Sequence, residues 1–270
     1  MTLWFTLIIL LPSCVLSMVL YRTMTARAYD LLVEDNYAVL NIARESISRS
    51  AASVENMVEM LSLDSDLNQL LSDGKQTQYQ RVVKILFELG DLFSQAQLML
   101  SGLDARVSLY FMDARIPETY WSFLRFERLE RRENYQRFLS TGKNAGWSGL
   151  DWIYPEETDL RPSGNQQMLC YNQKILSGFG ECVGVIRCGV SPQKIFSPLQ
   201  MEGSGDACYV LCGGETIYAS NGAKPLPKNY DPAANKQILD RQLYLTREVE
   251  GMDVSLVMRL DYRALHRQAL

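Results

Sequence analysis

The chain begins with a long uncharged stretch. Residues 2–21, TLWFTLIILLPSCVLSMVLY, carry no charge, and a helix of that length spans roughly 30 Å, the thickness of a bilayer core. We predict an uncleaved transmembrane helix over residues 1–21. The alternative is a cleaved signal peptide, but the apolar run is long, no basic leader precedes it, and the nearest small-x-small site, Ala26 to Ala28, lies beyond it. The orientation stays open, because Arg22 and Arg27 lie on the C-terminal flank.

A helical pattern follows. No glycine or proline interrupts residues 21–73, and apolar side chains recur at the spacing of one helix face. These positions are Val33, Tyr37, Leu40, Ile47, Ala51, Val54, Val58 and Leu61. We predict one helix over about 22–63, a new helix start at Asp64 to Asp66, and a second long helix over about 77–100. The apolar positions expected in that second helix are Val82, Val83, Ile85, Leu86, Leu89 and Leu92.

From residue 105 onward the pattern is that of short strands. Residues 105–113 predict one strand. Three hairpins follow, and their turns are expected near 177–180, at Gly213 and Gly214, and near Gly251. Short helices are expected between the strands, over about 131–140, 191–199 and 232–241.

Two strand-to-helix passages repeat one pattern about 70 residues apart. They are VIRCGVSPQKIF, residues 185–196, and SLVMRLDYRALH, residues 255–266. In each, an apolar run ends at a helix N-cap residue, Ser191 or Asp261. We interpret each passage as the last strand of an antiparallel sheet that leads into an exit helix. The chain then holds two consecutive small modules of strands and helices.

Composition and charge exclude several classes of function. Hydrophobic residues make up 47% of the chain, and the net charge is −4, which argues against a nucleic-acid partner. The only histidine is His266. One histidine at this position does not suit a Ser-His-Asp or Cys-His catalytic arrangement, or a metal site with imidazole ligands. We therefore expect no enzyme, no metal and no cofactor, and we interpret Asp151, Glu156 and Glu157 as part of a solvated loop.

The cysteines do not form a metal-binding pattern. Beyond Cys14 they are Cys170, Cys182, Cys188, Cys208 and Cys212, with no Cys-x-x-Cys. We interpret most of them as small buried residues on strands. Whether Cys170 and Cys188 form a disulfide across their hairpin stays open.

Aromatic and arginine side chains gather between residues 110 and 171. Aromatic rings with a few polar groups suit a small-molecule pocket, and flat rings suit sugars. The expected ligand contacts are Tyr110, Trp121, Arg125, Arg132, Tyr135, Trp147, Trp152 and Tyr171. We expect Trp147 and Arg132 to line a cavity of the first module, and no comparable cavity in the second. The alternative is that half of these aromatics are core residues, Tyr110 among them.

This organisation, together with NYQRFLSTGKNAGWSG (134–149) and VSLVMRLDYRAL (254–265), resembles the double-Cache (dCache) extracytoplasmic sensors of bacterial receptors. The sensors of YesM-type histidine kinases are the most similar. The resemblance implies an α+β fold with a transmembrane helix and a long stalk helix before two tandem PAS-like antiparallel-sheet modules. The implied divisions are a transmembrane helix (1–21), stalk helices (22–104), a membrane-distal Cache module (105–200), a membrane-proximal Cache module (201–265) and the start of an exit helix (266–270).

The resemblance also implies a ligand site. Some members of the family bind amino acids through Arg-x-Trp-Tyr and a later aspartate. Here Arg132 and Tyr135 match, but Asn134 replaces the tryptophan and the aspartate position falls at about Gly189. An ammonium group would lose its counter-charge, so a sugar or another small neutral or anionic solute is expected rather than an amino acid.

We therefore expect the ligand-sensing region of a two-component sensor histidine kinase in the cell membrane, with residues after about 22 extracytoplasmic. The expected partners are a small-molecule ligand in the distal module, the membrane, and a second copy of the chain paired along the stalk helices. The alternatives are the sensor of a chemotaxis receptor and a cell-surface protein-interaction module without a pocket.

Overall fold

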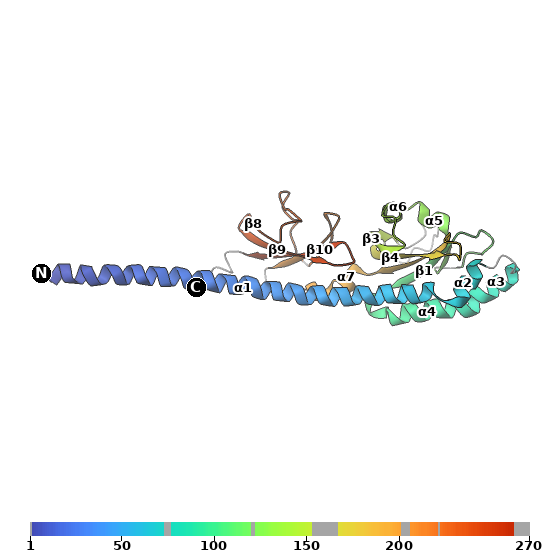
Figure 1. The fold of residues 1–270 in the computed structure, drawn as a ribbon, viewed down its shortest axis with the longest axis horizontal. Helices are drawn as coiled ribbons and strands as arrows, with labels where there is room; N and C mark the ends of the chain where they lie inside the picture. Colours follow the sequence, from blue (N-terminus) through green and yellow to red (C-terminus); the bar gives the residue numbers. More distant parts are fainter. Residues whose placement is uncertain are drawn as a thin grey trace.

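The computed structural model describes residues 2–72, 77–119, 122–152, 167–200, 206–220 and 222–261, with side chains from residue 13 onward. One helix, α1 (Thr2–Ser62), runs along the whole molecule (Figure 1). No helix in the described part of the chain is both long and apolar enough to cross a membrane. The side chains of residues 1–12, which belong to the predicted transmembrane helix over 1–21, lie outside the described residues.

Helix α1 buries the apolar stripe that the sequence predicts. Val33, Leu40, Ile47, Ala51, Val54, Val58 and Leu61 are all buried. The same helix contacts strands of both sheets, β4 and β5 in the first and β9 and β10 in the second. The prediction of one long helix packed against both modules is therefore confirmed.

The next helices begin close to the residues that the sequence predicts. Asp64 Oδ1 accepts hydrogen bonds from the backbone N–H groups of Asp66 and Leu67, at 3.0 and 2.9 Å, and so caps α2 (Ser65–Ser72). The predicted helix over 77–100 comprises three segments: α3 (Gln78–Lys84), the π-helical η1 (Ile85–Leu89) and α4 (Gly90–Met99).

The buried face of this second helix differs from the predicted one. Leu86 was expected on it but is 54% exposed, whereas Arg81, Ile85, Leu89 and Phe93 are buried. The buried residues recur at every fourth position through the π-helical turn η1, and Leu86 falls outside this row.

Two five-stranded sheets follow, with the same relative strand order. The first has the order β2-β1-β5-β4-β3 and the second β7-β6-β10-β9-β8. The strands of the first sheet are β1 (Arg106–Phe111), β2 (Phe123–Arg125), β3 (Ala145–Trp152), β4 (Gln167–Leu176) and β5 (Cys182–Val190). Those of the second are β6 (Ala207–Cys212), β7 (Glu215–Ala219), β8 (Lys236–Leu239), β9 (Gln242–Val249) and β10 (Val254–Asp261). The last strand of each module, β5 in the first and β10 in the second, thus lies at the centre of its sheet.

Pairing is antiparallel except between β1 and β2, which are parallel. Short helices connect the strands: η2 (Ser101–Leu103), α5 (Phe126–Glu130), α6 (Glu133–Ser140), α7 (Pro192–Ile195) and η3 (Ser197–Leu199). The hairpin at Gly213 and Gly214 has positive φ at both glycines, 57° and 85°, which the tight turn requires. The exit helix expected after Asp261 lies outside the described residues.

One expected helix is wrong. Residues 232–241 were expected to be helical, but Lys236–Leu239 forms the edge strand β8, which pairs with β9. Asp240 and Arg241, both with positive φ, make the tight turn between the two strands. Pairing with a neighbouring strand overrides the weak helical pattern of so short a segment.

Each face of the first sheet has its own cover (Figure 1). Helices α1 and α4 lie against one face and α5 and α6 against the other. We call these the helix face and the outer face. Val107, Leu109, Leu169, Ile186 and Cys188 point to the helix face and join one core with α1. Alternation places the residues between them, such as Ser108 and Arg187, on the outer face.

Candidate functional site

A buried polar cluster lies on the outer face of the first sheet. Arg187 Nη2 lies 2.5 Å from Asp151 Oδ2, and Arg132 Nη1 lies 3.3 Å from Asp151 Oδ1. The side chains of Arg187, Asp151 and Arg132 are only 2%, 10% and 12% exposed. Charged groups are rarely buried to this degree unless they are paired or functional. We call Arg132, Asp151, Asn172 and Arg187 the polar cluster.

Several polar atoms of this region have no protein partner. Within the described residues, Nε and Nη1 of Arg187, Oδ1 of Asn172 and the hydroxyl of Tyr135 make no hydrogen bond, although all three side chains are buried. A buried guanidinium N–H without an acceptor is costly. The outer face therefore offers two charged donors, one amide acceptor and one hydroxyl to a ligand.

Neutral groups also lie beside the polar cluster. Asn172 Nδ2 donates to Ser148 Oγ at 2.9 Å, which fixes the amide. Burial raises the pKa of the Cys170 thiol and of the Tyr110 hydroxyl, so both stay protonated at neutral pH. Burial alone would lower the pKa of Arg187, but Cys170, Tyr110 and Asp151 beside it raise that pKa above its ordinary value. Arg187 therefore stays charged.

A β-bulge brings Asp151 to this face. The register of β3 against β4 shifts between Trp147 and Leu150, where Gly149 has a φ of 80°. Without the bulge, strict alternation would place Trp147 and Asp151 on the same face. With it, Trp147 packs on the helix face and Asp151 points to the outer face. The interpretation of Asp151 as part of a solvated loop is therefore wrong.

The structure brings only some of the predicted site residues together. Tyr110 and Tyr135 share a small core on the outer face. Arg132 joins the polar cluster and also donates to the backbone carbonyl of Trp152. Trp152, at the end of β3, is 39% exposed. These four residues lie in one region.

The other four predicted residues lie elsewhere. Trp147 donates from Nε1 to Glu55 Oε1 of α1 at 2.7 Å, and its ring lies 5.4 Å from that of Tyr171 on the helix face. Arg125, at the end of β2, lines a separate hollow. Trp121 lies outside the described residues. The ligand contacts of all eight stay predictions, but the arrangement separates Trp147, Tyr171 and Arg125 from the polar cluster.

Two residues of the cluster were missed by the sequence reasoning. Arg187 interrupts the apolar strand CVGVIRCGV, and a charge in a buried strand is a usable signal. Asn172 lies in QMLCYNQKIL, on the neighbouring strand β4. Its significance depends on the register that places it opposite Arg187, which the sequence does not reveal.

The second sheet also has a hollow, contrary to our expectation. It measures about 540 Å³ and lies beside β6 and the loop that follows β7. The side chains around it include Tyr209, Thr216, Lys224 and Tyr230. Another hollow of about 630 Å³ lies between the two modules and is lined by residues such as Trp147 and Gly251. The expectation that the second module has no comparable cavity is therefore wrong.

The cysteines of the described residues are free thiols. Cys170 pairs with Gly189 across the hairpin, and Cys188 pairs with Tyr171. The two sulfur atoms therefore lie on opposite faces of the sheet. A disulfide between them is not formed.

No protein-family model matches the chain, and no curated protein sequence does either. Solved structures do resemble it. The sensory domain of the Campylobacter jejuni chemoreceptor Tlp3 with isoleucine bound shares 12% identity at a TM-score of 0.58, covering 90% of this chain and 97% of that one. The sensor domain of the V. cholerae histidine kinase DctB shares 13% identity at a TM-score of 0.54, covering 86% and 98%.

A third similar structure is the ligand-binding domain of the Pseudomonas aeruginosa amino-acid chemoreceptor PctB in complex with L-Arg. It shares 14% identity at a TM-score of 0.55 and covers 86% of this chain and 96% of that one. These likenesses span nearly the whole of each solved domain, so they establish the fold. The chain shares the α+β fold of these solved domains, with two five-stranded sheets along one long helix. The double-Cache family itself stays what the sequence resemblance implies. The closer likeness to YesM-type kinases stays a prediction.

Proposed function

We propose that this chain is the extracytoplasmic ligand-binding region of a bacterial transmembrane receptor, and that the polar cluster of the first sheet binds the ligand. One observation carries the proposal: Arg187 is 2% exposed and keeps two nitrogen atoms, Nε and Nη1, without a hydrogen-bond partner among the described residues. A charge buried in this way, on the face under α5 and α6, gains most from an anionic ligand.

The charges of the cluster favour a small carboxylate. Among the described residues of the cluster, Arg132 and Arg187 carry two positive charges and Asp151 one negative charge, which is a surplus of one positive charge. A carboxylate would neutralise this surplus and accept from Nε or from Nη1 of Arg187, whose N–H groups point in different directions. A neutral sugar would leave this charge uncompensated. We therefore propose a carboxylate ligand in place of the sugar that the aromatic side chains suggested.

Similar structures bind amino acids, which also carry a carboxylate: isoleucine in Tlp3 and L-Arg in PctB. In this chain Asp151 already pairs with two arginines, so it is poorly placed to receive an ammonium group as well. The cluster therefore favours a carboxylate whose second polar group is a hydroxyl or carbonyl. Amino acids form the comparison arm of the test.

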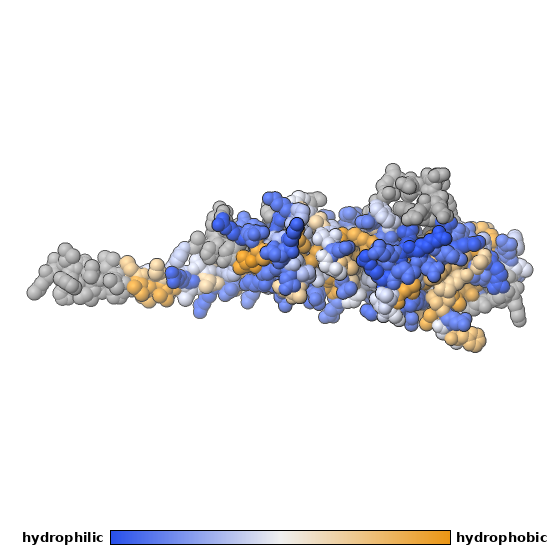
Figure 2. All heavy atoms as spheres, turned by 90° about the horizontal axis from the view of Figure 1, so that it is seen from above, coloured by the Kyte–Doolittle hydropathy of each residue, from blue (hydrophilic) through white to orange (hydrophobic). Residues whose placement is uncertain are grey.

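The membrane anchor belongs to the proposal too. The described side chains Val15, Leu16, Met18, Val19 and Leu20 are 52–61% exposed and form an apolar band around α1 (Figure 2). Such a band is costly in water and stable in a bilayer. We assign 1–21 as the transmembrane helix, with the later residues extracytoplasmic.

The proposed output is a histidine kinase, and pairing of two chains along α1 would transmit the signal. Both DctB, a kinase, and the chemoreceptors share the fold, so the fold does not choose between these outputs. Ligand-dependent phosphorylation by the full-length receptor would support the kinase. Ligand-dependent control of a separate kinase would instead support a chemotaxis receptor.

A thermal-shift screen tests the ligand site. Hydroxy and keto acids, amino acids and sugars are titrated against the purified chain, and a bound ligand raises Tm with increasing concentration. We expect a carboxylate to do so, and we expect Arg187→Met to weaken its binding about 30-fold, because the buried charge and its hydrogen bond to the ligand are lost. Arg137→Ala, which removes an exposed arginine on α6, is the matched control. A sugar that binds equally to Arg187→Met would contradict the site, and no binding of any solute would favour a protein-interaction module.

A further inference from the structure

Asn172 is a fully buried amide that has a partner at only one of its two ends. Its exposed fraction is 0%, and it lies on β4 directly opposite Arg187 of β5. Its Nδ2 donates to Ser148 Oγ at 2.9 Å, whereas its Oδ1 finds no donor within the described residues. A buried amide oxygen without a donor is costly. The position therefore favours a ligand that brings an N–H or O–H group.

The hydroxyl of Ser148 fixes which end of the amide is left over. Ser148 Oγ donates to the backbone carbonyl of Cys170 at 3.4 Å. A serine hydroxyl has one proton to give, so it can only accept from Asn172. If the amide were turned over, Asn172 Oδ1 would meet an oxygen whose proton is already used. The amide nitrogen is thus held toward Ser148, and Asn172 presents an acceptor.

Arg187 beside it presents the opposite kind of group. Its Nε and Nη1 have no hydrogen-bond partner in the described part of the chain, and both are donors. A carboxylate oxygen suits Arg187, but it has only lone pairs and cannot donate to Asn172. The ligand therefore needs a proton donor close to its carboxylate. A hydroxyl on the next carbon atom supplies that proton, and a keto oxygen does not.

An amino group would also donate to Asn172, but it carries a positive charge. That charge would lie close to the buried guanidinium group of Arg187, and like charges in a buried site repel strongly. Asp151, the carboxylate of the polar cluster, already pairs with Arg187 and Arg132. A hydroxyl donates the same hydrogen bond without the charge.

We propose that Asn172 makes the site selective for 2-hydroxy acids over the 2-keto and 2-amino acids of the same carbon skeleton. This inference rests on the proposed function, because it takes the carboxylate of the ligand to bind Arg187. A site built to pair with a ligand hydroxyl discriminates against the analogue that lacks it, since a buried polar group is then left unpaired. The loss of one such hydrogen bond corresponds to about tenfold in affinity.

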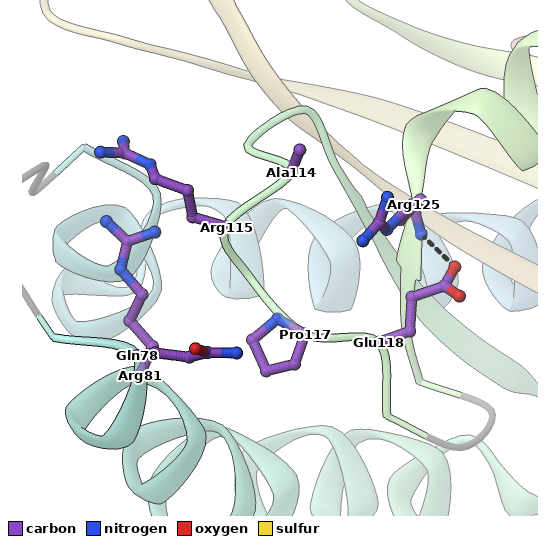
Figure 3. A pocket seen from close by; sticks show the side chains of 7 residues that line it. All are labelled: Gln78, Arg81, Ala114, Arg115, Pro117, Glu118 and Arg125. Carbon is purple, nitrogen blue, oxygen red and sulfur yellow. Dashed lines mark hydrogen bonds between the residues drawn. The ribbon is translucent and has the colours of Figure 1, made fainter.

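The first module has another hollow, which does not include Asn172. It measures about 540 Å³ and lies beside α3. Figure 3 shows the guanidinium groups of Arg81 and Arg115 on one side of it and that of Arg125 on the other. No residue of the polar cluster lines this hollow. Arg125→Gln is therefore a control for binding at the wrong place.

The probes are three sets of acids that differ only at the second carbon atom. They are lactate, pyruvate and alanine; 2-hydroxyglutarate, 2-oxoglutarate and glutamate; and the 2-hydroxy, 2-oxo and 2-amino forms of 4-methylpentanoate. Each is titrated against the purified chain by calorimetry. In the set that binds most tightly, we expect the hydroxy acid to bind about tenfold more tightly than the keto acid, and the amino acid to bind more weakly than the hydroxy acid.

Two variants assign the selectivity to Asn172. Asn172→Leu has a similar size and no acceptor, so hydroxy and keto acids should bind it equally. Ser148→Ala keeps Asn172 but releases its amide, which can then turn its nitrogen toward a keto oxygen. The preference should fall below about threefold, whereas Ser140→Ala, which removes a hydroxyl from the exposed end of α6, should keep it at about tenfold.

The selectivity and the site itself fail in different ways. A keto or amino acid that binds the wild type as tightly as the hydroxy acid, and that Arg187→Met weakens, would overturn the selectivity and leave the carboxylate site standing. A tenfold preference that persists in Ser148→Ala and in Asn172→Leu would overturn the role of Asn172. Binding that depends on Arg125 instead of Arg187, or no binding of any acid, would overturn both proposals.

Discussion

At the scale of single residues, the contribution of the polar cluster to the free energy of unfolding depends on Asp151. It is the one carboxylate, among the described residues, that pairs with both Arg132 and Arg187. Breaking a buried ion pair by removing one partner is far more costly than replacing the whole pair with apolar groups, because a buried charge is left uncompensated. The cluster therefore ties the stability of the first sheet to its candidate ligand site.

Asp151→Asn should lower the free energy of unfolding by about 3 kcal/mol, since it takes away the carboxylate that pairs with the buried guanidinium group of Arg187. Urea unfolding measures the change. Glu133→Gln, in an exposed pair with Arg137, is the control and should change stability by less than about 0.5 kcal/mol. Equal stability of Asp151→Asn and wild type would show that the cluster is hydrated rather than buried, against this account. A carboxylate ligand should still stabilise the variant, because Arg187 keeps its donors.

The candidate site was only partly predictable from the sequence, for reasons that individual residues show. Arg132 and Tyr135 were found through a motif, which is a local signal. Asp151 was misassigned because its face depends on the bulge at Gly149, and a one-residue shift reverses every side chain beyond it. Trp147 was expected in the pocket for its aromatic character, but the same bulge leaves it on the helix face beside Glu55.

At the scale of elements, predictability follows the length of the pattern. Helix α1 carries many turns of one apolar stripe, so its face was predicted almost residue by residue. The hairpin turns carried glycine signals of their own. Strand β8 is only four residues long, 236–239, and its conformation is set by β9 next to it, so a local reading could not find it.

Two isoleucines on α1 offer a matched test of this stripe. Ile47 is fully buried and Ile42 is 67% exposed. Ile47→Ala should lower the free energy of unfolding by about 2–4 kcal/mol through lost burial and a new cavity, whereas Ile42→Ala should change it by less than about 0.5 kcal/mol. Chemical denaturation at a concentration where the chain is monomeric gives both values. Similar losses in the two variants would mean that α1 does not pack through this face.

At the scale of the whole molecule, one core joins the two modules. Buried side chains of α1 and of both sheets belong to the same cluster, among them Ile47, Ile186 and Leu256. Glu55 of α1 accepts the indole N–H of Trp147, and it also lies close to Gly251 in the turn between β9 and β10. A displacement in the first sheet therefore has a direct physical route to the second through α1 and this contact.

The shared core predicts one cooperative unfolding transition. Apart from Trp4 near the start of the chain, the tryptophans are Trp121, Trp147 and Trp152, which lie between β1 and β4. In a Trp4→Phe variant tryptophan fluorescence thus reports on the first module, while hydrogen exchange of β9 and β10 reports on the second. We expect both probes to give the same midpoint in urea. Separate midpoints would show that the modules are independent and that α1 does not couple them.

The most direct test of the central claim is a crystal structure of the chain with the carboxylate that gives the largest thermal shift. We predict electron density for its carboxylate within hydrogen-bonding distance of Nε or Nη1 of Arg187, under α5 and α6, with Asn172 Oδ1 accepting from the ligand. A ligand found instead in the hollow beside Tyr209 and Tyr230 of the second module, with the polar cluster unchanged, would contradict the account.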